Sequence, residues 1–433
     1  MVRRSQVLNI RNNFYCSFIA LWICIFFFIC IKNLTYSTLE DQELLRQELQ
    51  REYDLAIRQP SLQTLQDHLL KTPSTENSTV VIVLAYFRSG STFFGQIFNV
   101  NPNMFYMFEP LRVFEILVDT ERRGNEFENT TAKLLERILR CEFTEQFSSS
   151  YMNTSTWVHY TKNLSSILRS GKKLQSPARI LRKMCLRYKG NIAMKTIRVT
   201  LPDVLEFLEK YPHGNLKIIH LVRDPRGVAN SLKLLGTPDD LKDAFELYLL
   251  GRLHTKPELS SLMDMSLLLP KSYHLGSNAD IAQYRATING YCHLVFHDLQ
   301  IAINPPDLLR NRYKLIRYED FAANPQVLTH KIYSFLEKPT PDSALIWLDN
   351  NTNVSYKNSS KQCLGLHKNS EETASKWRRY LNVEEVKQVQ DVCGAVMELL
   401  GYKSFDTEKS LLDFSVPATS PRLNYLGEDM SIT

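Results

Sequence analysis

The sequence from Val80 to Phe94, Val-Val-Ile-Val-Leu-Ala-Tyr-Phe-Arg-Ser-Gly-Ser-Thr-Phe-Phe, joins a strand, a polar turn and the start of a helix. Its first six residues are apolar and mostly β-branched, which is typical of a parallel strand buried on both faces. The turn carries an arginine, three hydroxyl groups and one glycine. The first N–H groups of a helix lack internal partners, and its dipole is positive there. The turn Arg88–Thr92, which we call the first anion loop, is therefore predicted to bind an anionic group.

A second stretch repeats this arrangement. Leu216–Val222 predicts another buried strand, with His220 as a core residue, and leads directly into Arg223-Asp-Pro-Arg-Gly-Val-Ala-Asn-Ser231, the second anion loop. In an open α/β sheet both loops lie at the carboxyl edge, where ligands bind. Together they predict a ligand with two separated anionic groups. For either loop taken alone, an ordinary turn whose serines only cap a helix is the alternative.

Functions from two other classes are alternatives for this pattern. A kinase loop has the form G-x-x-x-x-G-K-[ST], whereas the first anion loop has one glycine and no lysine. No arrangement of carboxylates demands magnesium, which also argues against a P-loop kinase with a luminal substrate. The other alternative is a catalytically silent membrane glycoprotein that binds glycans. A protein that had lost catalysis would be expected to lose its site residues as well, yet this chain keeps Arg88, Glu109, Arg223 and Ser231.

The two loops resemble motifs of a known family. Phe87–Phe93 resembles the 5′-phosphosulfate loop of Golgi carbohydrate sulfotransferases, and Arg223–Ser231 resembles their 3′-phosphate motif. The likeness is strongest to the galactose/N-acetylglucosamine/N-acetylgalactosamine 6-O-sulfotransferase branch. It continues through Phe108–Leu111, Leu315–Asp320 and the segments around Trp377 and Tyr402. Thr92 replaces the serine of many members and keeps its hydroxyl.

The resemblance implies a P-loop-like, three-layer α/β domain with a central parallel sheet. It implies the donor 3′-phosphoadenosine-5′-phosphosulfate (PAPS), no metal, and a glycan acceptor on a glycoprotein or proteoglycan, sulfated at C6. The donor-binding residues that it implies are Phe87, Arg88, Ser89, Gly90, Ser91, Thr92, Phe93, Arg223, Asp224, Pro225, Arg226, Gly227, Val228, Ala229, Asn230 and Ser231.

Sulfuryl transfer needs in-line geometry and a stabilised leaving group, as phosphoryl transfer does. Arg88 is the candidate catalytic cation for the charge that develops on the leaving oxygen. Glu109, among Phe105, Tyr106 and Phe108, is the candidate general base, with a pKa that its apolar surroundings are expected to raise. The alternative for Glu109 is a structural carboxylate that forms a salt bridge with a donor-site arginine.

Four other residues each have two interpretations, and a fifth, Arg378, has one. Lys195, at the end of the predicted inner strand Asn191–Arg198, supports the donor or forms a surface salt bridge. Glu319 and Asp320 are expected to be helix N-caps rather than catalytic groups. Trp377 is expected in the core, with sugar stacking as the alternative. Arg378 is a candidate for closing over the donor.

The 433 residues carry a net charge of +6 and favour one large α/β domain with attachments. Phe14–Ile31 is eighteen uncharged residues that span about 27 Å as a helix, and arginines precede it. The predicted organisation is a cytoplasmic tail (1–13), a transmembrane signal-anchor (14–31), a stem (32–77), a luminal sulfotransferase domain (78–405) and a C-terminal tail (406–433). This organisation predicts a single-pass type II membrane protein, and the family resemblance implies the Golgi membrane; a cleaved signal peptide is the alternative.

The predicted luminal part has features of that compartment. The stem favours a solvated helix, with a coiled-coil homodimer as the alternative. Sequons begin at Asn77, Asn129, Asn153, Asn163, Asn350, Asn353 and Asn358. No basic run with interleaved aromatics favours nucleic acid. Five luminal cysteines are expected in an oxidising compartment; with one left over they allow 5 × 3 = 15 pairings, among which Cys363–Cys393 and Cys141–Cys185 are the predicted pairs.

Overall fold

The computed structural model describes residues 78–113, 125–153, 160–162, 164–165, 176–210, 215–234, 277–352, 366 and 369–420. The predicted anchor and stem, the tail beyond 420 and Cys363 lie outside these ranges. Among the described residues, no helix combines the length and apolar character that a bilayer crossing needs.

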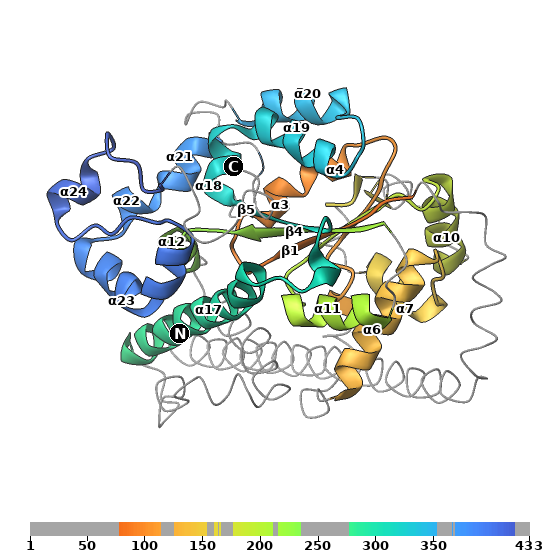
Figure 1. The fold of residues 1–433 in the computed structure, drawn as a ribbon, viewed down its shortest axis with the longest axis horizontal. Helices are drawn as coiled ribbons and strands as arrows, with labels where there is room; N and C mark the ends of the chain where they lie inside the picture. The colour runs from red at the N-terminus through yellow and green to blue at the C-terminus, as the bar shows by residue number, and fades with distance from the viewer. Residues whose placement is uncertain are drawn as a thin grey trace, which may run out of the picture. The chain divides into compact units, whose positions relative to one another are not determined.

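A five-stranded sheet forms the centre of the domain (Figure 1). Its strands are β1 (Val80–Ala85), β2 (Phe105–Phe108), β3 (Ile192–Thr196), β4 (Leu216–Val222) and β5 (Tyr313–Arg317), in the order β2-β3-β1-β4-β5. All neighbouring pairs are parallel. Every residue of β1 is buried, as expected for an apolar strand covered on both faces. The predicted parallel sheet is confirmed.

Helices cover both faces of this sheet (Figure 1). One face is covered by α3 (Ser91–Phe94), α4 (Gln96–Asn99), α18 (Tyr318–Ala323), α19 (Pro325–Phe335) and α20 (Asp342–Thr352). The other is covered by α11 (Leu201–Lys210) and α17 (Ser277–Ile303). The remaining helices are α6 (Asn125–Leu139), α7 (Glu145–Asn153), α10 (Pro177–Arg187), α12 (Pro225–Lys233), α21 (Ser370–Ser375), α22 (Trp377–Tyr380), α23 (Val383–Leu399) and α24 (Glu408–Leu412).

Some helices differ from the prediction. The single helix expected after the first anion loop is two short helices, α3 and α4, divided at Gly95. A Cβ atom at Gly95 would lie 2.2 Å from the Tyr106 hydroxyl oxygen, so a side chain there has no room. Three helices, α21 to α23, lie between Ser370 and Leu399. Between the two anion loops, α7 follows α6 after a short turn.

Two disulfides link helices of the described part. Cys141–Cys185 joins a residue two positions after the end of α6 to α10 and confirms one predicted pair. Cys393 of α23 pairs with Cys292 of α17, so the predicted Cys363–Cys393 pair is wrong. The pairing follows from the packing of α17 on α23, which brings Cα atoms 101 residues apart in sequence to 5.4 Å.

His220 is fully buried, as predicted for a core residue, and lies in a chain of hydrogen bonds. The Tyr86 hydroxyl donates to Asp298 Oδ2 at 2.6 Å, so its oxygen is left to accept the Nε2–H of His220 at 2.8 Å. His220 Nδ1 then accepts from the Tyr313 hydroxyl at 2.7 Å. Burial lowers the pKa of His220 to about 4, against the opposing charge of Asp298. The imidazole is therefore neutral at pH 7.

Candidate active site

The first anion loop begins directly after β1. The Ser89 N–H donates to the Tyr86 carbonyl at 3.1 Å, which turns the chain away from the strand. Arg88 has a φ of 66° and Gly90 a φ of 82°, in the left-handed region. A Cβ atom at Gly90 would lie 2.4 Å from the Tyr318 ring, so glycine is required for both shape and space. Ser91, Thr92 and Phe93 follow in α3.

The second anion loop meets the first. Arg223 Nη1 donates to the Arg88 carbonyl at 2.9 Å. Arg88 Nε donates to Ser231 Oγ at 2.8 Å, and Ser231 lies in α12. The two predicted loops thus form one continuous site after β1 and β4, as expected for neighbouring parallel strands.

Several polar atoms of this joined site lack partners. Ser89 Oγ, Arg223 Nε and Asn230 Oδ1 are buried and have no hydrogen-bond partner within the described part of the chain. The Arg223 guanidinium lies 4.6 Å from the Tyr318 ring centroid, which fixes its plane. A buried polar group without a partner lowers the stability of the fold by about 1–3 kcal/mol, so such a cluster indicates a ligand-binding site. The cationic character of the site favours an anion.

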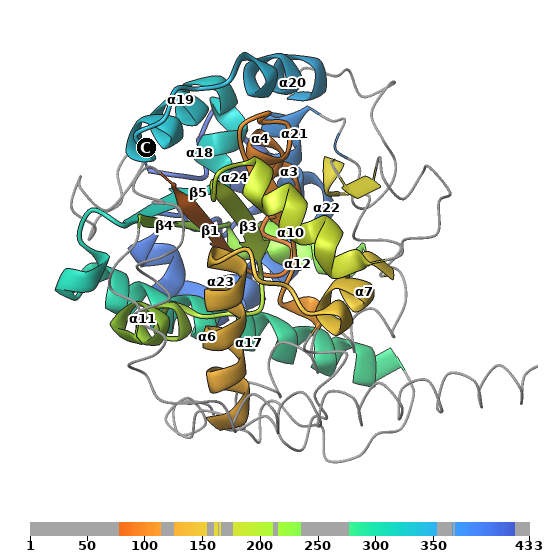
Figure 2. The same cartoon turned by 90° about the vertical axis from the view of Figure 1, so that its right-hand side faces the viewer.

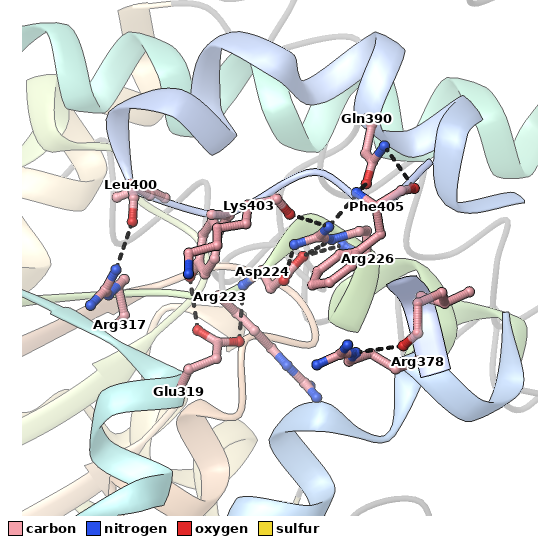
Figure 3. A network of polar contacts seen from close by, with 12 residues as sticks. Arg223, Asp224, Arg226, Arg317, Glu319, Arg378, Gln390, Leu400, Lys403 and Phe405 are labelled. Atoms are coloured by element: carbon pink, nitrogen blue, oxygen red, sulfur yellow. Dashed lines mark hydrogen bonds and ion pairs between the residues drawn. The ribbon is translucent and has the colours of Figure 1, made fainter. Parts of the chain in front are cut away.

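Arg226 is hydrogen-bonded inside the protein. It is fully buried and donates to both Asp224 carboxylate oxygens, to Gln390 Oε1 and to the Lys403 carbonyl (Figure 3). Its guanidinium also lies 4.1 Å from the Trp377 ring centroid. These four hydrogen bonds give Arg226 a positioning role in the fold, and its predicted contact with the anion stays a prediction. Arg226 fastens the start of α12 to α23.

The other predicted residues of the second anion loop are buried within or next to α12. Asp224 caps the helix, with its side chain accepting from the Arg226 N–H at 2.9 Å. Pro225, Gly227, Val228 and Ala229 are buried in the helix. A Cβ atom at Gly227 would lie 3.0 Å from Arg223 Nε, so glycine leaves room for that guanidinium.

Glu319 belongs to this site, which the sequence interpretation missed. Its carboxylate accepts from the Asp224 N–H at 3.1 Å (Figure 3). It also accepts from the Tyr402 hydroxyl at 2.8 Å. Burial and the charge of Asp224 raise the pKa of Glu319 to about 7, while Arg223 opposes the shift. The expected N-cap role is wrong, because no side chain caps α18.

Asp320 is not an N-cap either. Its two carboxylate oxygens accept from the Arg317 guanidinium at 2.7 and 2.9 Å. Arg317 also donates to the Leu400 carbonyl (Figure 3). Asp320 therefore orients an arginine that joins β5 to the end of α23.

Glu109 follows β2 and has a φ of 49°, again in the left-handed region. It is buried, forms an ion pair with Lys195 and accepts from Arg198 Nη1 at 2.6 Å. Burial alone would raise the pKa of Glu109, but the charges of Lys195 and Arg198 outweigh it and lower the pKa. The expected raised pKa is wrong, because the apolar neighbours are accompanied by two buried cations from β3 and the residues after it.

Lys195 and Arg378 differ from the sequence interpretation, whereas Trp377 agrees with it. Lys195 is buried rather than at the surface, and burial lowers its pKa while Glu109 opposes the shift. Trp377 is 1% exposed and lies in the core, as predicted. The guanidinium of Arg378 donates to the carbonyls of Ser410, Leu411, Asp413 and Val416, so it is not free to close over a ligand. It holds the segment after α23 against the domain.

Comparison with known proteins decides the family. Residues 78–401 match the family model for the sulfotransferase domain. The chain belongs to the sulfotransferase family. Carbohydrate sulfotransferase 1 of Homo sapiens is 30% identical to this sulfotransferase over 382 residues, covering 79% of the chain and 84% of the relative. Carbohydrate sulfotransferase 2 of Mus musculus is 27% identical over 364 residues, covering 78% and 67%. The family predicted from the two anion loops is confirmed.

Solved structures resemble the sulfotransferase more distantly. The sulfotransferase domain of the Synechococcus PCC 7002 olefin synthase is 16% identical with a TM-score of 0.35, covering 74% of this chain and 94% of that one. This score is too low to support an argument about the site. Within the described ranges, no group of three or more His, Cys, Asp or Glu residues gathers as a metal site would require.

Proposed function

We propose that this sulfotransferase transfers a sulfuryl group from PAPS to the C6 hydroxyl of a Gal, GlcNAc or GalNAc unit in a glycan. The observation that carries the donor assignment is the joined pair of anion loops, with buried unpartnered atoms on Ser89, Arg223 and Asn230. The names of the relatives and the resemblance to the 6-O branch support the acceptor.

The residues of each loop fit one end of the donor. The first anion loop offers the Arg88 guanidinium, the Ser89 hydroxyl and the first N–H groups of α3 to a 5′-phosphosulfate. Arg223, with an unpartnered Nε, and Ser231 offer donors to a 3′-phosphate. That second phosphate distinguishes PAPS from ATP, so the second anion loop also supplies the donor specificity.

PAPS supplies a sulfuryl group activated by its phosphate ester leaving group. The sulfur–oxygen bond to the 5′-phosphate breaks as a new bond forms to the sugar oxygen, and Arg88 stabilises the charge left on the bridging oxygen. The hydroxyl proton passes to the Glu109 carboxylate. Because Lys195 and Arg198 keep that carboxylate ionised, it is in the protonation state that a base requires.

A transfer assay tests the function directly. The full chain is incubated with sulfur-35 PAPS and a panel of keratan, chondroitin and N-glycan acceptors, and the label is mapped to a position. Label at C6 of one sugar is the expected result. Absence of binding to adenosine 3′,5′-bisphosphate would overturn the donor assignment. Preference for ATP over PAPS in competition would favour the kinase alternative.

Glu109→Gln tests the base. We expect turnover to fall ~10²–10⁴-fold while affinity for adenosine 3′,5′-bisphosphate is kept, since the amide cannot accept the proton. The matched control is Glu142→Gln, at an exposed carboxylate. Because the variant leaves Lys195 and Arg198 with a neutral partner, thermal melting measures the folded fraction. Turnover that falls only in proportion to that fraction would assign Glu109 a structural role.

The proposal includes the location of the enzyme. The uncharged stretch Phe14–Ile31 anchors it in the Golgi membrane as a type II protein with a luminal domain. Protease protection in sealed microsomes tests this orientation: the domain is expected to be protected until detergent is added.

A further inference from the structure

One segment of the chain is basic throughout. Residues 146–202 contain eleven Lys and Arg residues and no Asp or Glu. Since the whole chain has a net charge of only +6, the rest of it carries a net negative charge. Such an asymmetry indicates a surface for an anionic partner rather than a generally basic protein.

Helix α10 displays part of this charge. Its inward side carries Leu181 and Cys185, both fully buried, and the Cys141–Cys185 disulfide fixes it to the end of α6. In both views α10 lies beside α7 (Figure 2). The exposed cations of the helix, which we call the α10 basic face, are Arg179, Arg182, Lys183 and Arg187.

Within the part of the chain that the structure describes, these cations have no acidic partner. No residue of the α10 basic face forms an ion pair with an acidic residue of the described ranges. Glu145, at the start of α7, accepts instead from the Ser176 hydroxyl and the Ala178 N–H at the start of the helix. The positive face is therefore exposed as a unit.

The arrangement is unfavourable for the helix itself. Arg179, Lys183 and Arg187 are spaced four residues apart, about 6 Å per step, and like charges at this spacing repel. Arg179 also lies in the first turn, where the helix dipole disfavours a cation. Stability does not explain the single sign of this face, whereas an anionic chain along it would relieve the repulsion.

The basic segment contacts the residue next to Glu109, the proposed base. The Tyr151 hydroxyl donates to the Phe108 carbonyl at 3.1 Å, and the Tyr160 ring stacks on Phe108 at 4.9 Å. Phe108 immediately precedes Glu109. The Lys162 N–H donates to Asn99 Oδ1 at 2.8 Å, and the Lys162 side chain is exposed. The same segment thus supports the candidate base and carries the positive surface.

We infer that the α10 basic face binds a polyanionic glycan, so that the acceptor is a chain already bearing carboxylate or sulfate groups. This deepens the proposed function, on which it rests for the identity of the acceptor. An anionic membrane surface offers negative charge as well. Membrane binding would not explain why the basic segment contacts the residue next to Glu109, so it is one of the outcomes of the test.

The test measures binding of a heparin decasaccharide, and of a neutral N-acetylglucosamine hexamer, to the full chain at several salt concentrations. We expect heparin to bind more tightly, with affinity falling steeply as salt rises. Lys183→Glu with Arg187→Glu is expected to weaken heparin binding about tenfold or more and to flatten its salt dependence. The matched control, Lys387→Glu with Lys409→Glu, makes the same charge change at exposed positions elsewhere and is expected to bind within about twofold of wild type.

Other outcomes overturn the inference. Equal binding of the neutral and the sulfated chains would do so, as would equal losses in the two double variants. Binding to phosphatidylserine vesicles that exceeds heparin binding and is lost in the α10 variant would assign the face to a membrane. Adenosine 3′,5′-bisphosphate binding separates the two hypotheses. Heparin binding without nucleotide binding refutes the donor assignment alone, and the reverse refutes the α10 inference alone.

Discussion

At the scale of single residues, Gly90 determines the shape of the first anion loop. Its φ of 82° costs any other residue about 1–2 kcal/mol, and a Cβ atom would meet the Tyr318 ring at 2.4 Å. We expect Gly90→Ala to lower the free energy of unfolding by about 2 kcal/mol or more and to weaken nucleotide binding. Urea unfolding and calorimetry measure the two effects.

Gly394→Ala is the matched control for that change. Gly394 lies in α23 with no atom within 4 Å of an added Cβ, so alanine is expected to stabilise the helix by about 0.5–1 kcal/mol. Equal effects of the two substitutions would show that the loop tolerates a side chain at Gly90.

Glu319 makes nucleotide binding depend on protons. Its pKa is raised to about 7, so its neutral form favours the fold and the associated stability is lost as pH rises through 7. An anion beside Arg223 would cancel the cation that opposes protonation, and so raise the pKa of Glu319 further. We expect binding of adenosine 3′,5′-bisphosphate at pH 7.5 to take up about half a proton more in wild type than in Glu319→Gln.

Calorimetry in two buffers with different ionisation enthalpies measures this proton uptake. Because the ligand phosphate also exchanges protons, the difference between wild type and Glu319→Gln is the informative quantity. The same uptake in both proteins would mean that Glu319 does not respond to the ligand.

At the scale of elements, α17 supports both anion loops from the opposite face of the sheet. The Tyr291 hydroxyl donates to the Arg223 carbonyl at 2.9 Å, and Asp298 accepts from Tyr86, two residues before Arg88. Cys292, next to Tyr291, forms the disulfide with Cys393. One turn before Cys393, Gln390 accepts from Arg226, so the disulfide connects the supports of Arg223 and Arg226.

Removing this disulfide is expected to affect the 3′-phosphate end of the nucleotide selectively. In Cys292→Ser with Cys393→Ser, affinity for adenosine 3′,5′-bisphosphate is expected to fall about tenfold, because Arg223 loses its fixed position. Affinity for adenosine 5′-monophosphate, which lacks the 3′-phosphate, is expected to change by about twofold or less. Titration calorimetry of both nucleotides measures the two affinities.

The second disulfide provides the control for this experiment. Cys141→Ser with Cys185→Ser is expected to lower stability by about 2–5 kcal/mol and to leave both nucleotide affinities unchanged in the folded protein. Parallel losses for the two nucleotides in the Cys292 and Cys393 variant would indicate general destabilisation instead of a positioning effect.

At the scale of the whole molecule, the sequence predicted features that are local in the chain. The strands Val80–Ala85 and Leu216–Val222 are continuous apolar runs, and the loops after them are contiguous motifs. It did not separate Arg223, which faces the site, from Arg226, which faces α23, because both lie in one motif. Nor did it predict the cations that lower the pKa of Glu109, since these come from β3, more than eighty residues later.

Acid stability of the whole domain depends on the His220 network, which joins β1, β4, β5 and α17. His220 has a pKa of about 4 in the fold and an ordinary value of 6.5 when unfolded, so the unfolded chain binds the proton first as pH falls. Stability is therefore lost from pH 6.5 down to pH 4, by up to about 3 kcal/mol from this group.

We expect His220→Gln to be less stable than wild type at pH 7 but to lack the loss of stability that His220 causes between pH 6.5 and pH 4. Urea unfolding at pH 7, 5.5 and 4.5 measures it, with His330→Gln at an exposed position as the control. An unchanged pH dependence in His220→Gln would show that other groups cause the acid instability.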